Sequence, residues 1–545
     1  TGPLFPQSPR QRRYSAVRIR ARAIHRSKDS DLPKHRDNGD EAHYLKEYGF
    51  PVANFSKGLP HNPRGEAERH AYEKLLYALR TGRPEDYGGI PLANPGGRPY
   101  VNPQSALAFE LEGVDPQGVT IPPAPRFDSR QNMAEMVELY WMALLRDVPF
   151  TGYGDDKHVA AAAAELEQYR DVFDVPHVER ITPDTLFRGR TSGDLRGPYL
   201  SQFLLHDVPL GSLTIPQRQS TVIPGADYMT RFDDWLAVQN GVLPGEDRLD
   251  ATPRYLRNLR DLARYVHVDQ LYQAYLNAAL LLLDKKAPVD PGNPYVDSPN
   301  QEGFGTFGGP ALLALLPEVS SRALKAVWSQ KWNVHRRLRP EEYGGRIEVA
   351  RRGDASYPVG ELVLSSKAHQ RVLSRYGSSL LPQAFPEGSP MHPAYGAGHA
   401  TVAGACVTLL KAWFDTRQLL CLPTMVPSAD GTTLVPYQGP DANTLTVGDE
   451  LDKLAANISI GRNGAGVHWR TDYTESIRLG ERITLEILQE VSLLPNEQHA
   501  FELETFDGQL VRIEGGGITR LRPVFPRGRA SAMDELEELV PSIAS

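Results

Sequence analysis

The stretch from His399 to Asp415, HATVAGACVTLLKAWFD, consists almost entirely of apolar and small side chains. A run of this kind predicts an apolar helix that begins at His399. Apolar residues at helical spacing on either side of it predict further helices, at about 132–144, 158–172, 230–239, 253–283, 310–336, 448–459 and 471–492.

Strand signals are sparse and are clear only from Phe501 to Leu521, where a turn at Asp507-Gly508 separates two short segments. Residues 30–131 are rich in Pro, Gly and Asn, which predicts long loops between short helices. The helices follow one another without a long linker or an internal repeat. We therefore expect a mainly α protein with one large domain of packed helical bundles (residues 45–522) that includes a small C-terminal β-hairpin. A basic N-terminal arm (residues 1–44) precedes this domain, and a C-terminal tail (residues 523–545) follows it.

The composition is that of a large folded protein. Hydrophobic residues make up 40% of the 545 residues, charged residues make up 23%, and the net charge is -7. That sign disfavours nucleic acid, which proteins hold through excess lysine and arginine. The longest strongly apolar stretch, around Ala278–Leu283, is far shorter than the roughly 20 residues that span a bilayer. We expect a soluble protein, cytoplasmic or secreted, without a membrane span.

Basic residues and cysteines are used unevenly along the chain. Every charged residue before Asp29 is an arginine or a lysine, which fits a transit segment or an arm for an anionic surface. A solvated or partner-draped arm is the favoured interpretation. Cys406 and Cys421 are the two cysteines, too few for a disulfide framework or a cysteine-built metal site, and two free thiols are favoured over one disulfide.

Long cations and histidines gather in three segments where loops join the predicted helices. These are residues 331–340 (KWNVHRRLRP), residues 393–399 (PAYGAGH) and residues 461–472, which include Arg462, His468 and Asp472. The sequence has no HExxH, CxxC, GxSxG or Walker-type pattern. The three segments are therefore the most distinctive candidates for a functional site.

The first two segments favour an anion site. Pro340 disfavours helical geometry at Arg339, which frees the guanidinium of Arg339 to converge with Lys331. Gly398 permits a close approach of the backbone. His399 opens the apolar helix, whose free N–H groups favour an anion.

The third segment adds a cation and a second histidine. Its glycines are expected to break any helix, so that a loop directs Arg462 and His468 inward, while Asp472 orients the imidazole of His468. Together the segments predict an oxyanion cage that tetrahedral phosphate or vanadate would fit. Taken singly, these residues are typical of a solvated helix face or of core histidines, but the order and spacing of all three segments favour the cage.

The segments resemble those of the vanadium-dependent haloperoxidases and the type-2 phosphatidic acid phosphatases. The shared pattern is a lysine followed by Arg-Pro, then Pro-Ser-Gly-His, then Ser-Arg with a histidine six residues on and an aspartate four further. Residues 140–150, 232–241 and 304–309 also look like bromoperoxidase segments, so the resemblance covers about residues 45–522. Seven residues separate Lys331 from Arg339, as in the algal haloperoxidases, whereas the phosphatases have six.

The resemblance implies a role for each site residue. His468 resembles the axial ligand of vanadium, and His399 resembles the acid–base residue that handles the protons of peroxide. The groups that hold the vanadate oxygens would be Lys331, Arg339, Arg462 and the amide of Gly398. His392 and Trp328 match residues that line the halide pocket of bromoperoxidases.

The same resemblance implies an activity and its partners. The protein would use vanadate and hydrogen peroxide to oxidise bromide or chloride to an electrophile equivalent to hypohalous acid, with Lys331 assisting by hydrogen bonding. The electrophile would halogenate a small, electron-rich organic substrate. Phosphate would occupy the site when vanadium is absent, and we expect a homodimer or a higher homo-oligomer.

Two departures from the family pattern keep other functions open. Ala397 and Gly461 stand where the family often has serine, which removes hydroxyl donors from the site. The alternatives are a phosphatase with His468 as nucleophile, a halide-independent acid–base rearrangement catalyst that uses His399, and a non-catalytic oxyanion-binding protein. Asp297, Asn300 and Glu302 lie where some relatives hold calcium, although their spacing fits no EF-hand and an ordinary polar loop is favoured.

Overall fold

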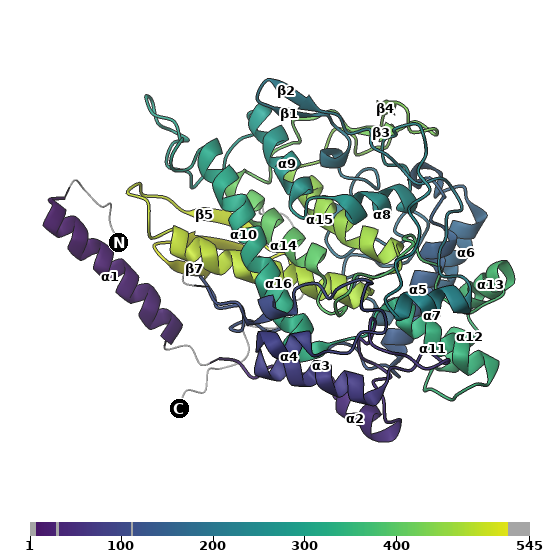
Figure 1. Ribbon diagram of the computed structural model, residues 1–545. Coiled ribbons are helices and arrows are strands. Elements are labelled where there is room, and N and C mark those ends of the chain that lie inside the picture. The colour runs from purple at the N-terminus through teal and green to yellow at the C-terminus, as the bar shows by residue number, and fades with distance from the viewer. Residues whose placement is uncertain (1–6, 29–31, 111–112, 522–545) are drawn as a thin grey trace, which may run out of the picture.

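The computed structural model describes residues 7–28, 32–110 and 113–521 (Figure 1). The predicted C-terminal tail, residues 523–545, lies outside the described residues. The α-helices are α1 (Pro9–Lys28), α2 (Asp40–Glu47), α3 (Arg69–Thr81), α4 (Pro84–Gly88), α5 (Arg130–Leu144), α6 (Lys157–Leu166), α7 (Phe232–Gln239), α8 (Leu259–Val268), α9 (Gln273–Asp284), α10 (Gly309–Ser329), α11 (Pro340–Arg352), α12 (Glu361–Leu364), α13 (Lys367–Tyr376), α14 (Gly398–Trp413), α15 (Val447–Gly464) and α16 (Arg470–Val491). The predicted mainly helical fold is confirmed.

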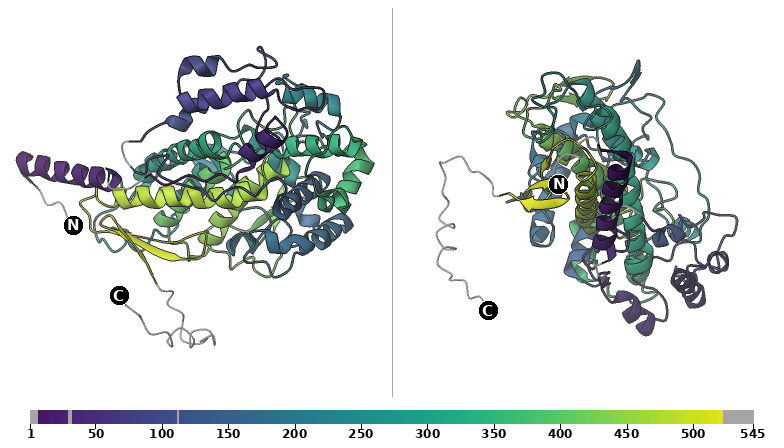
Figure 2. Two further views of the ribbon diagram at one scale, coloured as in Figure 1. Left: turned by 90° about the horizontal axis from the view of Figure 1, so that it is seen from below. Right: turned by 90° about the vertical axis from the view of Figure 1, so that its left-hand side faces the viewer.

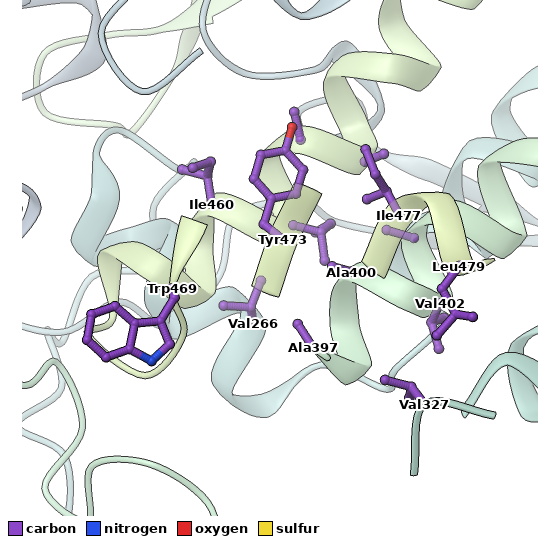
Figure 3. Packing of buried hydrophobic residues seen from close by; sticks show 14 of the residues in the cluster. Val266, Val327, Ala397, Ala400, Val402, Ile460, Trp469, Tyr473, Ile477 and Leu479 are labelled. Atoms are coloured by element: carbon purple, nitrogen blue, oxygen red, sulfur yellow. The ribbon is translucent and has the colours of Figure 1, made fainter. Parts of the chain in front are cut away.

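Helix α14 lies at the centre of a bundle with α10, α15 and α16 (Figure 1). Every residue of α14 except His399 is buried. Glycines let α14 and α16 approach closely, because a Cβ added to Gly404 or to Gly480 would come within 2.0 Å of the backbone of the facing helix. Figure 3 shows small and branched side chains, Ala400 and Ile477 among them, filling the space between these helices. The apolar helix predicted from His399 is therefore the core of the fold.

Four of the predicted helices differ from the observed ones in length or continuity. The helix expected over 158–172 is α-helical only to Leu166 and continues as a 3-10 helix, Glu167–Val172. The helix expected over 253–283 is two helices, α8 and α9, with a break after Val268. The helix expected over 310–336 ends in a single π-helical turn, Gln330–His335. The helix expected over 448–459 continues to Gly464. The last three of these differences fall beside the candidate site.

The strands form three small antiparallel sheets. β1 (Val208–Leu210) pairs with β2 (Leu213–Ile215), and β3 (Met425–Pro427) pairs with β4 (Leu434–Pro436). The third sheet has the order β5 (Phe501–Glu504), β6 (Leu510–Glu514) and β7 (Gly517–Arg520), with Phe501 opposite Ile513. The C-terminal hairpin predicted at Asp507-Gly508 is confirmed, and a further turn adds β7 to it.

The basic helix α1 projects at one edge of the molecule (Figures 1 and 2). No helix among the described residues is long and apolar enough to cross a membrane. Cys406 is buried and Cys421 is half-buried, and both are free thiols, as expected. Four of the methionines in the described part of the chain are buried: Met136, Met142, Met229 and Met391.

Candidate active site

Lys331 and Arg339 lie on either side of a sharp change in backbone direction. Lys331 belongs to the π-helical turn that follows α10, and Arg336 directly after that turn has a φ of 40°. Arg339 is extended and immediately precedes Pro340, the first residue of α11. Proline fits this first helical position because its missing N–H would have no partner there. The predicted release of Arg339 from a helix is confirmed, and both cations are completely buried.

Helix α14 begins at the site, as predicted. Gly398 is its first residue, and a Cβ there would lie 3.1 Å from the ring of Trp328, so glycine allows the helix end to approach that ring. His399 follows, and its Nε2 lies 3.0 Å from Oδ1 of Asp269. Asp269 comes directly after α8, at the break that the sequence analysis did not anticipate.

The expectation that glycines break the helix around Arg462 is wrong. Gly461 and Gly464 are both helical, and Arg462 lies in the last turn of α15. A Cβ on either glycine would come within 3.1 Å of α8, so these glycines serve the close packing of α8 on α15. His468 does lie outside helices, in the link between α15 and α16, as expected.

Three buried cations in the site lack carboxylate partners. Lys331 donates to the carbonyl oxygens of Pro393 and Ala394, at 2.9 and 3.0 Å. Arg339 and Arg462 also bond backbone carbonyls, and among the described residues none of the three cations forms an ion pair. The Nε of Arg462 is buried without a partner. Buried charges of one sign are costly unless an opposite charge joins them, so the arrangement calls for an anion.

The electrostatics agree with this interpretation. Burial, followed by the nearby Arg339, holds the pKa of Lys331 well below its ordinary value. Burial lowers the pKa of Arg339 to about 9 and that of Arg462 to about 10. An oxyanion among these three groups would favour their charged forms. The donor set therefore fits a tetrahedral oxyanion such as vanadate.

Hydrogen bonds fix the tautomer of His468. Arg339 approaches Nε2 of His468 at 2.9 Å, and because a guanidinium only donates, Nε2 accepts. His468 therefore carries its proton on Nδ1 and donates it to Asp472 at 2.8 Å, as expected from the sequence for this pair. Nδ1 of His392 lies 2.9 Å from the donor Arg339 and 3.1 Å from the acceptor oxygen of Pro393, so these contacts do not assign its tautomer. Burial, followed by Lys331 and Arg339, keeps the pKa of His392 well below the ordinary value.

A cavity of about 290 Å³ opens onto this arrangement. Six of the predicted site residues line it: Trp328, His392, Gly398, His399, Arg462 and His468. Lys331 and Asp472 lie behind that lining, and Arg339 reaches it through its bonds to His392 and His468. A larger cavity of about 990 Å³ is lined by residues 149–154, 183–205 and 426–444 and contains none of the predicted site residues, so volume alone does not locate the site.

Asp269 and the pair His267–Glu387 also belong to the site, and neither was predicted from the sequence. Nε2 of His267 lies 2.6 Å from Glu387, and both side chains line the cavity. The only sequence signal for Asp269 was a polar residue inside a long apolar pattern, which a helix tolerates on an exposed face. The contact between Asp269 and His399 could therefore be identified only from the three-dimensional structure.

Comparison with known proteins agrees with the site geometry. A family model described as the VCPO second helical-bundle domain matches residues 365–497. The chain is 37% identical to a vanadium-dependent bromoperoxidase of Corallina officinalis, with 87% of this chain and 94% of the relative covered. It is 35% identical to that of Ascophyllum nodosum, with 85% and 86% covered. The chain belongs to the vanadium-dependent haloperoxidases.

The fold supports the same assignment of this haloperoxidase. It matches the solved homohexameric structure of the second vanadate-dependent bromoperoxidase of Ascophyllum nodosum with a TM-score of 0.88 at 28% identity, over 94% of this chain and 92% of that one. The family resemblance inferred from the three segments is thus confirmed, and vanadate is the cofactor that the family implies. Among the described residues, no group of three or more His, Cys, Asp or Glu gathers at a metal position, and Asp297, Asn300 and Glu302 are exposed.

Proposed function

We propose that this haloperoxidase holds vanadate in the cage of cations and uses hydrogen peroxide to oxidise bromide. The observation that carries the proposal is a group of three buried cations without ion pairs at one cavity, which His399 and His468 line. Arg462 lines the cavity, Arg339 bonds His468 at its wall, and Lys331 lies behind the wall. A site that only bound an anion would need the cations, but it would have no use for a histidine paired with a carboxylate beside them. The bromide assignment is supported by the names of the relatives and by His392 at the cavity wall.

Each site residue has a role in this proposal. Nε2 of His468 would bond the vanadium in place of the hydrogen bond that it now receives from Arg339. Lys331, Arg339, Arg462 and the amide of Gly398 would hold the vanadate oxygens. Bound vanadate supplies a Lewis-acidic centre that activates hydrogen peroxide without a change in oxidation state. Asp269 holds His399 through Nε2, which leaves Nδ1 to take and return the protons of peroxide.

The cavity wall suggests how halide and organic molecules are received. The rings of His392 and Trp328, with centres 4.8 Å apart, form the halide side of the cavity. Leu271, Leu324 and Phe385 provide an apolar wall for a small, electron-rich organic molecule. That molecule would react with the hypohalous acid or with an equivalent electrophile.

Assembly and cofactor exchange complete the proposal. We expect a homo-oligomer, since the matched bromoperoxidase of Ascophyllum nodosum is a homohexamer. Light scattering distinguishes a dimer from a hexamer. Phosphate is expected to occupy the cage when vanadate is absent, because it has the same tetrahedral shape. Calcium is not part of the proposal.

The test uses protein freed of phosphate. Peroxide-dependent bromination of a β-diketone is followed before and after orthovanadate is added, beside hydrolysis of an aryl phosphate ester. Bromination that requires vanadate and disappears in His468→Ala is the expected result. Ester hydrolysis without vanadate would indicate a phosphatase instead, and silence in both assays would favour rearrangement or binding.

A further inference from the structure

The hydrogen bonds of His468 lead to a group that lies deeper in the protein. Arg339 donates to Nε2 of His468, so Nδ1–H must point to Asp472. This tautomer leaves a lone pair on Nε2, which a vanadium ligand needs and which accepts from Arg339 in the structure. Whatever holds Asp472 therefore decides whether His468 presents the correct nitrogen.

Asp472 receives three hydrogen bonds and gives none. Its Oδ2 accepts from Nδ1 of His468 at 2.8 Å and from the backbone N–H of Trp469 at 3.1 Å. Its Oδ1 accepts from Nη1 of Arg337 at 2.9 Å. The carboxylate is completely buried, and Arg337 is the only cation that bonds it directly in the described structure.

Arg337 is itself held from several sides. Nη2 donates to Asn132 of α5 at 2.7 Å and lies 3.4 Å from Glu135 of the same helix. The guanidinium also lies over the ring of Trp469, 4.7 Å from its centre. The backbone oxygen of Arg337 accepts from the N–H of Ala394, in the segment that leads to His399. One residue thus joins α5, the start of α16 and the segment before α14.

We propose that Arg337 is a positioning residue for the vanadium ligand, which fixes Asp472 as the hydrogen-bond acceptor of His468 and so keeps Nε2 of His468 turned to the cofactor. The inference rests on the proposed role of His468. This role requires a planar guanidinium, because Nη1 must donate to Asp472 while Nη2 donates to Asn132 of α5. A lysine at this position has a single charged atom and cannot meet both demands at once.

Arg336 provides a matched control. It is the neighbouring residue, is mostly buried and forms two hydrogen bonds with Glu41, at 2.8 and 2.7 Å. None of its recorded hydrogen bonds involves Asp472 or His468. Removal of its charge should therefore cost stability without changing the ligand.

The experiment compares full-length wild type, Arg337→Met, Arg337→Lys and Arg336→Met. Orthovanadate affinity is measured by equilibrium dialysis and vanadium NMR, and folding by thermal unfolding. We expect vanadate binding to weaken roughly 10- to 100-fold in Arg337→Met and less in Arg337→Lys, and to stay within about 3-fold of wild type in Arg336→Met, as for other groups that orient a metal ligand. If Arg337→Met does not fold, the partial loss in Arg337→Lys carries the test.

A second readout needs no vanadate. Nitrogen-15 NMR of the histidine side chains in phosphate-free protein should show a protected Nδ1–H of His468, assigned by its loss in His468→Gln. We expect this signal in wild type and in Arg336→Met, and its loss or exchange broadening in Arg337→Met. An unchanged signal and affinity in Arg337→Met would overturn the proposal, as would equal weakening in Arg336→Met. If wild type fails to bind vanadate, the proposed function fails, and the NMR comparison still decides the role of Arg337.

Discussion

His399 and His468 have different roles because each is hydrogen-bonded to a different carboxylate. His468 is buried and donates its Nδ1 proton to Asp472, so the lone pair of Nε2, which accepts from Arg339, suits a metal bond. His399 is partly exposed at the cavity and pairs with Asp269 through Nε2. At the scale of single residues, the carboxylate bonded to each imidazole determines which ring nitrogen is available for chemistry.

Asp269 should therefore matter for turnover more than for cofactor binding. In Asp269→Asn we expect the bromination rate to fall roughly 10- to 100-fold, since a positioned acid–base group contributes about 10²- to 10⁴-fold and its orientation supplies part of that. Vanadate affinity, measured by dialysis, should change little. A variant with the wild-type rate, or one that loses vanadate in proportion to the rate, would contradict the assigned role.

Ala397 offers a gain-of-function test. It is the N-cap of α14, and its methyl side chain has no polar atom that could form a hydrogen bond with the helix end or with an oxyanion. Ala397→Ser should strengthen vanadate binding by a factor of about 5 to 10, the equivalent of one added hydrogen bond of about 1 kcal/mol. Titration with vanadate checks the affinity, and thermal unfolding separates it from helix capping. Added stability without added affinity would mean that the hydroxyl only caps the helix.

At the scale of elements, the sequence predicted the core better than the junctions. The helix from His399 was predictable because its apolar run has no other stable placement. The break before Asp269 was not, since the apolar pattern continues across it and only the contact with His399 requires the chain to turn. Gly461 was misjudged for a related reason: a glycine that ends a helix and one that admits a neighbouring helix look alike in one sequence. The cage residues themselves could all be named from their segments, whereas Asp269 and Arg337 act through contacts that no spacing reveals.

The α14–α16 contact gives an element-scale prediction. Gly480→Ala places a Cβ about where the backbone of Thr401 lies, so the helices must separate. We expect the free energy of unfolding to fall by about 1–3 kcal/mol, the usual cost of overpacking. Gly152→Ala is the control, because a Cβ at Gly152 meets no atom within 4 Å. Denaturant unfolding measures the free energy of unfolding of both variants. Equal values for Gly480→Ala and Gly152→Ala would show that α14 and α16 accommodate the added Cβ without loss of stability.

At the scale of the whole molecule, the overall charge conceals the character of the site. The chain carries a net charge of -7, yet its bundle centre gathers three buried cations that form no ion pair with a carboxylate of the described residues. Segments from Asp269 to Asp472 must be in place together to build this positive centre. Anion binding should therefore stabilise the complete fold and not one part of it.

The pH dependence of that stabilisation follows from the lowered pKa values. With no anion bound, burial lowers the pKa of Arg339 to about 9 and also holds the pKa of Lys331 well below its ordinary value, so the empty cage loses positive charge as the pH rises toward and above 9. An anion prefers the charged cage, so its affinity should be greatest below about pH 9 and should fall as the pH rises through that value. Thermal unfolding with phosphate, against sodium chloride of equal ionic strength, should show a shrinking difference above pH 9. A difference that stays constant to pH 10 would contradict the assignment.

The placement of sulfur in this molecule bears on how long it can work. An enzyme that releases a halogenating oxidant is itself exposed to that oxidant, and thiols and thioethers react with such oxidants readily. Met136, Met142, Met229, Met391 and Cys406 are all enclosed in the interior, where the released oxidant has to penetrate packed side chains to reach them. Cys421, Met133 and Met425 are only half-buried, so among the described sulfur atoms we expect these three to be oxidised first and to limit the working life of the protein.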